Sequence, residues 1–277
     1  MKSYFFVPGN RPEFLKNISE LKADHFIIDL EDSINEKEIG ISLENARNTD
    51  GFRNFYFRLS FNPQRPADQL QYIASLINDG VTRFVIPKIE NTNQLNDIIC
   101  FLQKHISDPT LLRFIVLIES PKALVCLRDI LEIPSVCAIG LGSHDYCQQM
   151  RMEHTEQNLL WPRMYILNYG KAFNKEIIDI ASMNIGDEEL FEAECQRAIS
   201  AGFNGKFIIH PNQLRILNSM ELYSDKELST ALKVRDYIKS LGGINFFTLA
   251  NFEGEVVEKT HLDRLRKILK MSGNETF

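Results

Sequence analysis

Cysteine is scarce in this sequence and shows no pairing pattern. The chain has five cysteines in 277 residues, an odd number, and none forms the close pairs typical of zinc sites or redox-active motifs. A disulfide-bonded framework is therefore disfavoured, and we expect reduced thiols in the core or on the surface. These thiols are Cys100, Cys126, Cys137, Cys147 and Cys195.

Long apolar runs and an excess of positive charge are also missing. No run reaches the ~18 apolar residues that a membrane-spanning helix needs. The stretch Ser3–Gly9 lacks the basic and apolar regions of a secretion signal. The net charge of −6 and the pI near 5.6 argue against nucleic acid or an anionic membrane as the main partner. We therefore expect a cytoplasmic protein that acts on a small molecule.

The sequence does contain a repeating alternation of short apolar runs and amphipathic helical patterns. With 44% hydrophobic content, the 277 residues suffice for one large domain. The alternation predicts a parallel (β/α)₈ barrel. About eight runs are typical of strands, at residues 4–7, 25–30, 55–59, 83–86, 113–118, 136–140, 177–180 and 207–209. Helical patterns cover Pro12–Leu21, Ala67–Ile77, Asn93–Leu102, Pro121–Leu131 and Glu188–Ala201.

An open, doubly wound sheet is the alternative architecture. The Gly-rich dinucleotide turn typical of that fold follows none of the predicted strands, so the barrel is favoured. The segment Asp145–Gly170 is long for a simple loop, and we expect it to cross the barrel mouth with its own helix. Such a segment would shape a substrate pocket.

We expect the barrel to span residues 1–240 and a C-terminal extension to span 241–277. In the extension, the β-prone segment Ile244–Val257 is broken by a turn near Glu253-Gly254, and an amphipathic helix follows at His261–Leu269. The extension is predicted to serve as a packing tail or oligomer contact, or as a lid.

Charged side chains stand where several predicted strands end. The run Phe114–Ile118 stops on Glu119, where a carboxylate is costly unless something pairs with it. Because the strands of a (β/α)₈ barrel end on one rim, these side chains are expected to meet there. In strand order they are Asp29, Glu31 and Asp32, then Arg58, then Lys88 and Glu90, then Glu119, then Asp145 and His210.

A metal ion is the predicted partner of these carboxylates. Close carboxylates repel one another by about 4 kcal/mol per pair at an effective dielectric near 20, so they need compensation. Oxygen ligation without a nearby cysteine favours magnesium or manganese over zinc. Glu119 and Asp145, on adjacent strands, are the first choices as direct ligands. For each acid taken alone, a helix cap or a surface ion pair is the competing interpretation.

Arg58 is the predicted anion-binding residue of the rim. It follows Phe55-Tyr56-Phe57, an apolar strand that would point its guanidinium at the rim. The planar guanidinium suits a carboxylate or a developing oxyanion, because it donates two parallel hydrogen bonds and keeps its charge. A structural salt bridge to Asp29 or Glu31 is the alternative.

Lys88 and two histidines also stand near strand ends. Lys88 would bind substrate or neutralise Glu119. His144 and His210 invite a catalytic role, but a lone histidine after a strand is more often a satisfied hydrogen-bonding residue.

Taken in order, several motifs resemble the citrate lyase beta-subunit-like branch of the HpcH/HpaI aldolase superfamily. Each motif alone is weak, but their order is specific and covers most of the chain. The motifs are Phe5–Glu13, Ile28–Ser33, Phe57-Arg58 with Asn62-Pro63, Ile86–Glu90, Leu117–Ser120, Gly140–Tyr146 and Gly205–Gln213.

The resemblance implies a metal-dependent barrel, assembled as a homo-trimer or hexamer, that cleaves or forms carbon–carbon bonds. The implied substrates are related oxo acids or acidic acyl thioesters of coenzyme A or an acyl carrier. The family's magnesium ligands carry over to Glu119 and Asp145, and its strand-three arginine to Arg58. The family's Asp-Leu-Glu-Asp run and two of its basic motif positions also have counterparts here. For the two basic residues, contact with the substrate's anionic groups and a structural role at the barrel rim are the alternatives. These residues are Asp29, Glu31 and Asp32, and Arg11 and Lys206.

The sequence departs from the family pattern at two places. Members that act on coenzyme A esters often carry a C-terminal aspartate that a neighbouring subunit presents to the site. The corresponding stretch here is Gly254–Thr260, in which Glu258 replaces that aspartate. In addition, His144 precedes Asp145 where the family more often has an acidic residue. Glu258 is our candidate for the proton-transfer role.

The leading hypothesis is a magnesium-dependent lyase, with manganese as a possible substitute, that performs retro-aldol or retro-Claisen cleavage or its reverse. Its substrate would be a small acidic acyl thioester of the citryl or malyl type. An aldolase for free 2-oxo acids is the alternative enzyme, and a binding or assembly subunit without turnover is the non-enzymatic alternative. The proposed catalytic residues are Arg58 and Glu258, and the proposed substrate-binding residues are Arg11, Arg58 and Lys88.

Overall fold

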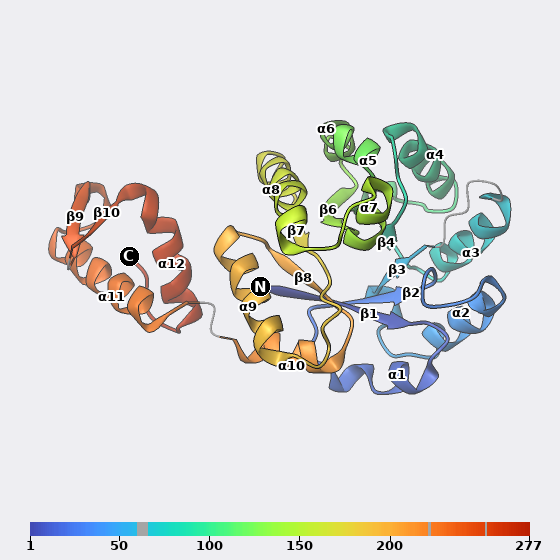
Figure 1. Ribbon diagram of the computed structural model, residues 1–277, viewed down its shortest axis with the longest axis horizontal. Coiled ribbons are helices and arrows are strands. Elements are labelled where there is room, and N and C mark those ends of the chain that lie inside the picture. The colour runs from blue at the N-terminus through green and yellow to red at the C-terminus, as the bar shows by residue number, and fades with distance from the viewer. Residues whose placement is uncertain (60–65, 221–222, 253) are drawn as a thin grey trace. The chain divides into compact units, whose positions relative to one another are not determined.

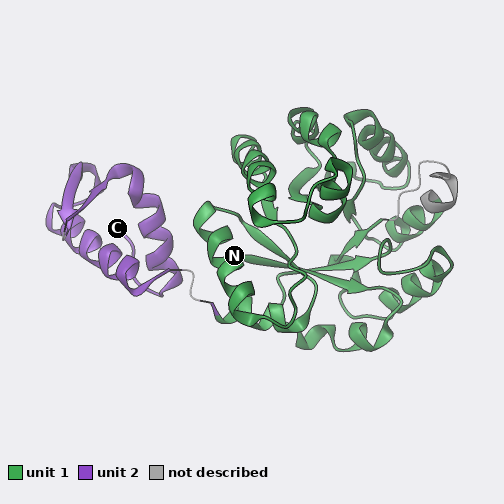
Figure 2. Ribbon diagram, viewed as in Figure 1, with its two compact units in different colours: residues 1–219 green, residues 220–277 purple. Residues whose placement is uncertain are grey.

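A computed structural model describes residues 1–59, 66–220, 223–252 and 254–277. The chain divides into two compact units, Met1–Ser219 and Met220–Phe277 (Figure 2). Each unit is described by itself. The sequence motif Asn62-Pro63 and the turn residue Glu253 lie outside the described residues.

The first unit is a closed parallel barrel, so the predicted (β/α)₈ fold is confirmed and the open sheet is excluded. Among the described residues, eight strands pair in chain order, and β8 pairs back onto β1 to close the ring (Figure 1). Each predicted strand overlaps one observed strand. The strands are β1 Lys2–Pro8, β2 His25–Asp29, β3 Tyr56–Arg58, β4 Arg83–Ile86, β5 Arg113–Ile118, β6 Val136–Leu141, β7 Glu176–Asp179 and β8 Gly205–Ile208.

Helices follow the strands and form the outer layer of the barrel (Figure 1). The pattern predicted as one helix from Pro121 to Leu131 forms two short helices that meet at Cys126. The helices of the barrel unit are α1 Pro12–Lys16, α2 Ile39–Arg47, α3 Pro66–Asn78, α4 Thr92–Gln103, α5 Pro121–Val125, α6 Leu127–Leu131, α7 Ser143–Met150, α8 Glu156–Ala172, α9 Glu188–Ala201 and α10 Pro211–Ser219.

The long segment after β6 differs from expectation. It forms two helices, and α8 packs against β6 and β7 as part of the outer layer instead of crossing the barrel mouth. The Thr155 hydroxyl caps this helix by accepting from the Asn158 amide, and Leu159 and Ile166 are buried on its inner face. Burial of an apolar face holds such a helix against the sheet more strongly than local propensity does. The first turn of α7 carries Asp145 at the rim.

Alternate residues of every strand fill the barrel interior. This core cluster consists of Tyr4, Ile27, Tyr56, Val85, Ile115, Leu117, Ala138, Ile178 and Phe207. Because side chains alternate across a strand, the neighbours of these residues face the helices. Asp179 and Lys206, next to Ile178 and Phe207, therefore face away from the barrel interior.

The C-terminal unit has its own apolar core. It comprises α11 Asp225–Ser240, an antiparallel hairpin of β9 Leu249–Phe252 and β10 Glu255–Glu258, and α12 Leu262–Met271. The predicted hairpin and final helix are thus present. The predicted boundary after residue 240 lies too late, because α11 packs against α12 through Val234, Ile238, Leu265 and Leu269. The role of this unit as lid or oligomer contact stays a prediction.

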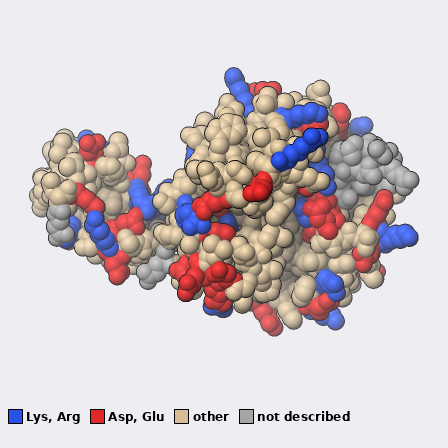
Figure 3. Space-filling view, in the orientation of Figure 1, with Lys and Arg blue, Asp and Glu red and all other residues tan. Residues whose placement is uncertain are grey.

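Acidic and basic side chains are interspersed on the face of the molecule drawn in Figure 3. Among the described residues, none of the helices combines the length and the apolar character that crossing a membrane requires.

The close packing of α8 on β7 predicts that one methyl group added at Gly170 lowers the free energy of unfolding. A Cβ at Gly170 would lie 2.4 Å from Cγ1 of Ile177. We expect Gly170→Ala to destabilise the protein by about 1–3 kcal/mol, the usual cost of overpacking. The measurement is urea unfolding followed by circular dichroism.

Gly40→Ala is the matched control, since a Cβ there meets nothing within 4 Å and lies inside α2. It should stabilise the protein by up to about 1 kcal/mol, because alanine is the better helix former. Equal unfolding midpoints for the two variants would contradict the proposed packing.

Candidate active site at the carboxyl ends of the strands

A cavity of about 280 Å³ opens among the loops that follow the strands. Its charged half comes from the elements β2 to β6 and the loops after them, and contains Asp29, Asp32, Arg58, Glu119 and Asp145. Its apolar half comes from β7, β8 and β1, with Ala181, Phe207, Ile209, Phe6 and Pro8. Leu117, Leu141, Gly142, Ser143 and His144 complete the lining together with Ser33.

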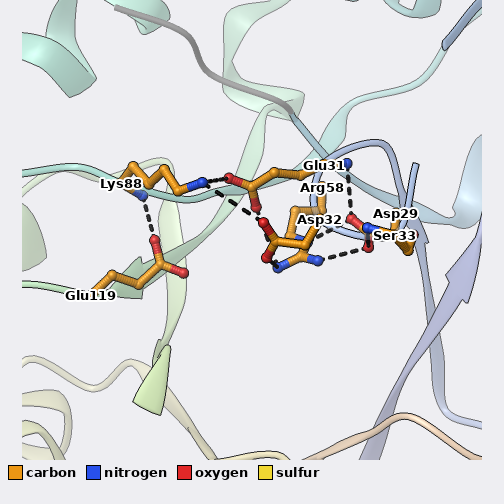
Figure 4. Close-up of polar contacts among 7 residues, drawn as sticks. All are labelled: Asp29, Glu31, Asp32, Ser33, Arg58, Lys88 and Glu119. Atoms are coloured by element: carbon orange, nitrogen blue, oxygen red, sulfur yellow. Dashed lines mark hydrogen bonds and ion pairs between the residues drawn. The ribbon is translucent and has the colours of Figure 1, made fainter. Parts of the chain in front are cut away.

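Arg58 is fixed by a bidentate ion pair with Asp29 (Figure 4). Its Nε and Nη2 donate to the two carboxylate oxygens at 2.7 Å each, and the side chain of Asp29 is only 4% exposed. The backbone amides of Glu31 and Ser33 donate to the same carboxylate. Burial works to raise the pKa of Asp29, but these hydrogen bonds and the charge of Arg58 outweigh it and lower the pKa. The structural salt bridge considered from the sequence is therefore present.

The remaining face of Arg58 meets two further acids (Figure 4). Its Nη1 donates to Asp32 at 3.0 Å and lies 3.3 Å from Glu31. Lys88 Nζ lies 2.8 Å from the other oxygen of Glu31. Within the described residues, these contacts of Glu31 lack hydrogen-bond geometry and both buried oxygens stay without a hydrogen-bond partner. Burial raises the pKa of Glu31 to about 7 although Arg58 and Lys88 oppose the shift.

Glu119 is buried directly after β5 and is held by a backbone amide. The amide of Lys88 donates to its Oε2 at 2.7 Å (Figure 4). Lys88 has a φ of 55°, a left-handed conformation that is uncommon outside glycine and that aims this amide at the carboxylate. Burial raises the pKa of Glu119 to about 8, with repulsion from Glu31 and Asp145 added and the Lys88 amide opposing.

Gly142 leaves the space that Glu119 occupies. A Cβ at this position would lie 2.3 Å from Cγ and 2.5 Å from Oε1 of Glu119. Any larger residue would therefore displace the carboxylate. Gly142 thus acts as a positioning residue, and its place between β6 and α7 was visible in the sequence only as part of a motif.

Asp145 lies in the first turn of α7 and lines the same cavity as Glu119. The amino end of a helix favours a negative charge. Within the described residues, no group of three or more His, Cys, Asp or Glu side chains is arranged to hold a metal ion. Glu119 and Asp145 are both carboxylates, and magnesium is commonly held by one or two carboxylates while substrate and water complete its coordination.

Charge balance at this cavity also fits a divalent cation. Asp29, Asp32, Glu119 and Asp145 line it, whereas Arg58 is the one Lys or Arg side chain among its described lining residues. A divalent cation would offset this excess and return Glu119 to its ionised state. The charges of these residues are therefore better balanced with magnesium bound than without it.

Three basic residues named from the sequence do not line this cavity. Arg11 is exposed at the start of α1, 3.8 Å from Glu13, so its substrate-binding role stays a prediction. Lys88 contributes through its amide and its contact with Glu31. Lys206 is fully buried on the helix side of β8, where Asp179 accepts from it at 2.9 Å, and its role in substrate contact stays a prediction.

The histidines and Glu258 are placed as follows. His210 accepts through Nδ1 from the Asn212 amide, as expected for a satisfied histidine. His144 lines the cavity and stacks on His154, with ring centroids 4.1 Å apart. His154, which no sequence signal pointed to, hydrogen-bonds Ser143 at 2.9 Å.

Glu258 ends β10 in the C-terminal unit, and its catalytic role stays a prediction.

A closed parallel barrel with a charged cavity at the carboxyl ends of its strands defines the class of the (β/α)₈ barrel enzymes. A comparison with protein families then identifies the particular family. The model described as HpcH/HpaI aldolase/citrate lyase matches residues 2–211, and the chain belongs to this family. It is a lyase family, as the resemblance of the motifs implied.

Individual relatives resemble the chain over nearly its whole length. Citrate lyase subunit beta of Leuconostoc mesenteroides subsp. cremoris is 25% identical over 281 residues, which cover 98% of this chain and 93% of the relative. A (3S)-malyl-CoA thioesterase of Cereibacter sphaeroides is 24% identical, covering 97% and 93%. The crystal structure of CitE from Mycobacterium tuberculosis, in complex with magnesium, acetoacetate and coenzyme A, superposes with a TM-score of 0.82 at 22% identity and covers 99% of this chain and 98% of that one.

The raised pKa of Glu119 predicts a pH-dependent stability. Its value of about 8 in the folded protein lies above the ordinary 4.5, so the folded state retains a proton that the unfolded state has lost. Stability is therefore lost as pH rises between these values. We expect Glu119→Gln, which keeps an acceptor for the Lys88 amide, to be more stable than the parent at pH 8 by on the order of 1–3 kcal/mol without divalent cations.

Thermal melts with a chelator present, at about pH 5 and pH 8, check this expectation. The difference should disappear at the lower pH. Exposed Glu44 in α2 supplies the control, and Glu44→Gln should leave both melting temperatures nearly unchanged. A Glu119→Gln protein that is less stable than the parent at pH 8 would contradict the burial of an unfavourable charge.

Proposed function

We propose that this protein is a magnesium-dependent carbon–carbon bond lyase that acts on a small acidic acyl thioester. The observation that carries the proposal is the pair Glu119 and Asp145 in one cavity with the anchored guanidinium of Arg58. The relatives support it, since one is a citrate lyase subunit, one a malyl-CoA thioesterase, and one a protein crystallised with magnesium, acetoacetate and coenzyme A.

In this proposal Glu119 and Asp145 hold the ion, and Mn²⁺ is an acceptable substitute for Mg²⁺. When bound, the ion supplies a Lewis acid that polarises a substrate oxygen and contributes several kcal/mol of charge stabilisation. The Lys88 amide and the space at Gly142 keep Glu119 in place beforehand. Such preorganisation matters because no reorganisation is needed when charge develops.

Arg58 is the proposed stabiliser of the enolate oxygen that forms when the carbon–carbon bond breaks. Asp29 holds two of its nitrogens, so Nη1 is the donor that can exchange Asp32 for substrate. Asp32 is exposed, with 57% of its side chain accessible, and an exposed ion pair is worth only about 0–1 kcal/mol. The exchange is therefore inexpensive, whereas Asp29 keeps the guanidinium aimed at the cavity.

Proton transfer is assigned by proposal to Glu258, which a neighbouring subunit of a homo-trimer or hexamer would present. Support for this comes from the family pattern and from the position of Glu258 at the end of β10. A carboxylate there would act as general acid or base. Arg11, on the exposed start of α1, is the proposed contact for the carrier's phosphates.

Two other functions compete with this proposal. An aldolase for free 2-oxo acids is motivated by solved relatives from Mycobacterium tuberculosis in complex with oxaloacetate or with pyruvate, each with magnesium. A binding or assembly subunit without turnover is motivated by Glu258, which replaces the family's aspartate.

Turnover assays distinguish these functions. We expect Mg²⁺-dependent release of an acetyl thioester from at least one of the malyl-, citramalyl- and citryl-type thioesters. Chromatography measures the amount of product. Glu119→Gln should lose at least about 100-fold in kcat/KM, because the ion's charge stabilisation goes with it. Glu44→Gln is the folded control that keeps activity.

Cleavage of 2-oxo acid adducts without cleavage of thioesters would favour the aldolase. A folded protein that binds Mg²⁺ but cleaves nothing in either panel would exclude both enzymatic functions and favour the assembly subunit.

The space at Gly142 predicts an effect on metal affinity that needs no substrate. Gly142→Ala must push Glu119 away from the Lys88 amide, since the added methyl would overlap its Cγ. We expect Mn²⁺ affinity, measured by titration calorimetry, to fall by roughly 10–100-fold, as for other groups that orient metal ligands. Gly186→Ala is the control, because a Cβ there meets nothing within 4 Å. An unchanged Mn²⁺ affinity of Gly142→Ala would show that Glu119 does not bind the metal ion.

A further inference from the structure

A serine and a histidine form a hydrogen-bonded pair at the cavity. Ser143 is the first residue of α7 and lines the cavity together with Asp145. The Nε2 atom of His154 lies 2.9 Å from the hydroxyl oxygen of Ser143. An imidazole at this distance can take up the proton of the hydroxyl. Neither residue binds the ion or the substrate in the proposed function.

The backbone after α7 brings His154 to this position. The helix ends before Arg151, which adopts a left-handed conformation with a φ of 53°. This conformation is uncommon outside glycine, and it turns the chain away from the helix axis. The amide of Met152 then donates to the carbonyl of Cys147, which holds the returning segment against the helix. A defined turn therefore places His154 next to Ser143.

Three contacts orient the His154 imidazole as a proton acceptor. Its ring stacks on that of His144, with centroids 4.1 Å apart and an angle of 10° between the planes. The backbone carbonyl of His154 accepts a hydrogen bond from the same ring. Because the bond at one ring nitrogen sets the role of the other, Nε2 is left to accept from Ser143. Burial, with His144 added, lowers the pKa of His154, so the ring is neutral near pH 7.

His154 also faces a second cavity, of about 290 Å³, which shares His144 and Ala181 with the first. The residue is exposed, so a proton taken from Ser143 can pass on to water. Glu194 lines the second cavity as well, and its negative charge favours the protonated form of His154. The pair thus connects the inside of the active-site cavity with the water outside it.

Cleavage of the proposed substrate requires two proton transfers. The hydroxyl on the carbon to be cleaved must lose its proton, and the enolate carbon of the departing acetyl thioester must gain one. In the proposed function Glu119 and Asp145 hold the ion that polarises a substrate oxygen, and Ser143 lines the same cavity. Ser143 can therefore accept the hydroxyl proton, which leaves Glu258 for the enolate carbon.

We propose that Ser143 and His154 form a proton relay that accepts the proton of the substrate's hydroxyl when the carbon–carbon bond breaks. The relay rests on the proposed lyase function and adds to it the group that starts the cleavage. The hydroxyl proton passes to the Ser143 oxygen while the proton of Ser143 passes to His154 Nε2.

The reaction is balanced without a co-reactant. The bond between the hydroxyl-bearing carbon and the CH₂ group breaks, and its electron pair passes to the thioester as an enolate. The hydroxyl-bearing carbon becomes the ketone or aldehyde carbon of a 2-oxo acid. His154 releases one proton to water and the enolate carbon receives one, so neither an oxidant nor a reductant is needed.

Replacing each partner tests the relay in the full chain with Mg²⁺, on whichever thioester or 2-oxo acid adduct the parent cleaves. We expect His154→Ala and Ser143→Ala each to lower kcat by at least about 100-fold, as for the loss of other general acids and bases. KM and the calorimetric Mn²⁺ affinity should stay within about threefold of the parent. The double variant should lose little more than either single variant, because groups that act as a unit are not additive.

Imidazole in the buffer separates a proton acceptor from a structural contact. His154 is exposed and faces the second cavity, so free imidazole can enter the space that His154→Ala leaves. We expect imidazole to raise the kcat of this variant by at least about tenfold. It should not raise the kcat of the double variant, which lacks the connecting hydroxyl. His105→Ala, at an exposed histidine after α4, is the control that keeps the parent's kcat.

His154→Phe keeps the test valid if His154→Ala does not fold. Phenylalanine retains a ring that stacks on His144 but has no nitrogen, so kcat should fall as far as in His154→Ala while Mn²⁺ affinity stays unchanged. Melting temperatures verify that each variant is folded. A folded His154→Phe protein with the parent's kcat would overturn the relay.

The outcomes separate the relay from the function on which it rests. If the parent cleaves a substrate and both alanine variants cleave it at the same rate, only the relay is overturned. If kcat of His154→Ala falls and imidazole does not restore it, the histidine merely supports α7 and the relay is overturned. If the parent cleaves neither thioesters nor 2-oxo acid adducts, the lyase function fails and the relay fails with it.

Discussion

The excess of negative charge on one rim is the constraint on which the architecture of this site depends. Five carboxylates interact there with only two cations, Arg58 and Lys88. The carboxylates are those of Asp29, Glu31, Asp32, Glu119 and Asp145. Closure of the barrel forces them together, because each follows a strand of one ring. The protein resolves part of the repulsion by ion pairs. Burial, with repulsion from neighbouring carboxylates added, raises the pKa values of Glu31 and Glu119, and a divalent cation beside them would oppose this shift.

Arg58 and Glu119 are held in place by different kinds of contact. The guanidinium is fixed by side chains, since Asp29 binds it through two nitrogens and is itself held by two backbone amides. The Glu119 carboxylate is fixed by backbone alone, through the Lys88 amide and the gap at Gly142. A backbone amide adds no charge, so it orients Glu119 without cancelling the negative charge that a metal ion needs. Strain at Lys88 is the cost of this arrangement, and such strain is found where function requires it.

The charged residues of the cavity lining come from only some of the strands. The ends of β2, β3, β5 and β6 and the loops after them bring charge to the cavity, whereas β7, β8 and β1 and the residues after them bring aromatic and aliphatic side chains. Family membership alone does not specify a substrate, since the relatives are named for, or were crystallised with, acids of several kinds.

The sequence by itself determined the barrel, its strands and the identity of the rim residues. Alternation of apolar runs with helical patterns is a local property, and strand ends can be counted along the chain without knowing distances. Arg58, Glu119 and Asp145 were found in this way, and the structure brings them to one cavity. The unit boundary at Ser219, by contrast, depends on the packing of α11 against α12, and the role of α8 depends on its contact with β6 and β7. Only the tertiary structure decided that Lys206 faces the helices, that the Lys88 amide holds Glu119, and that Gly142 leaves room for it. The physical reason is that these features are distances between separate strands, which are set when β8 pairs with β1 and closes the ring.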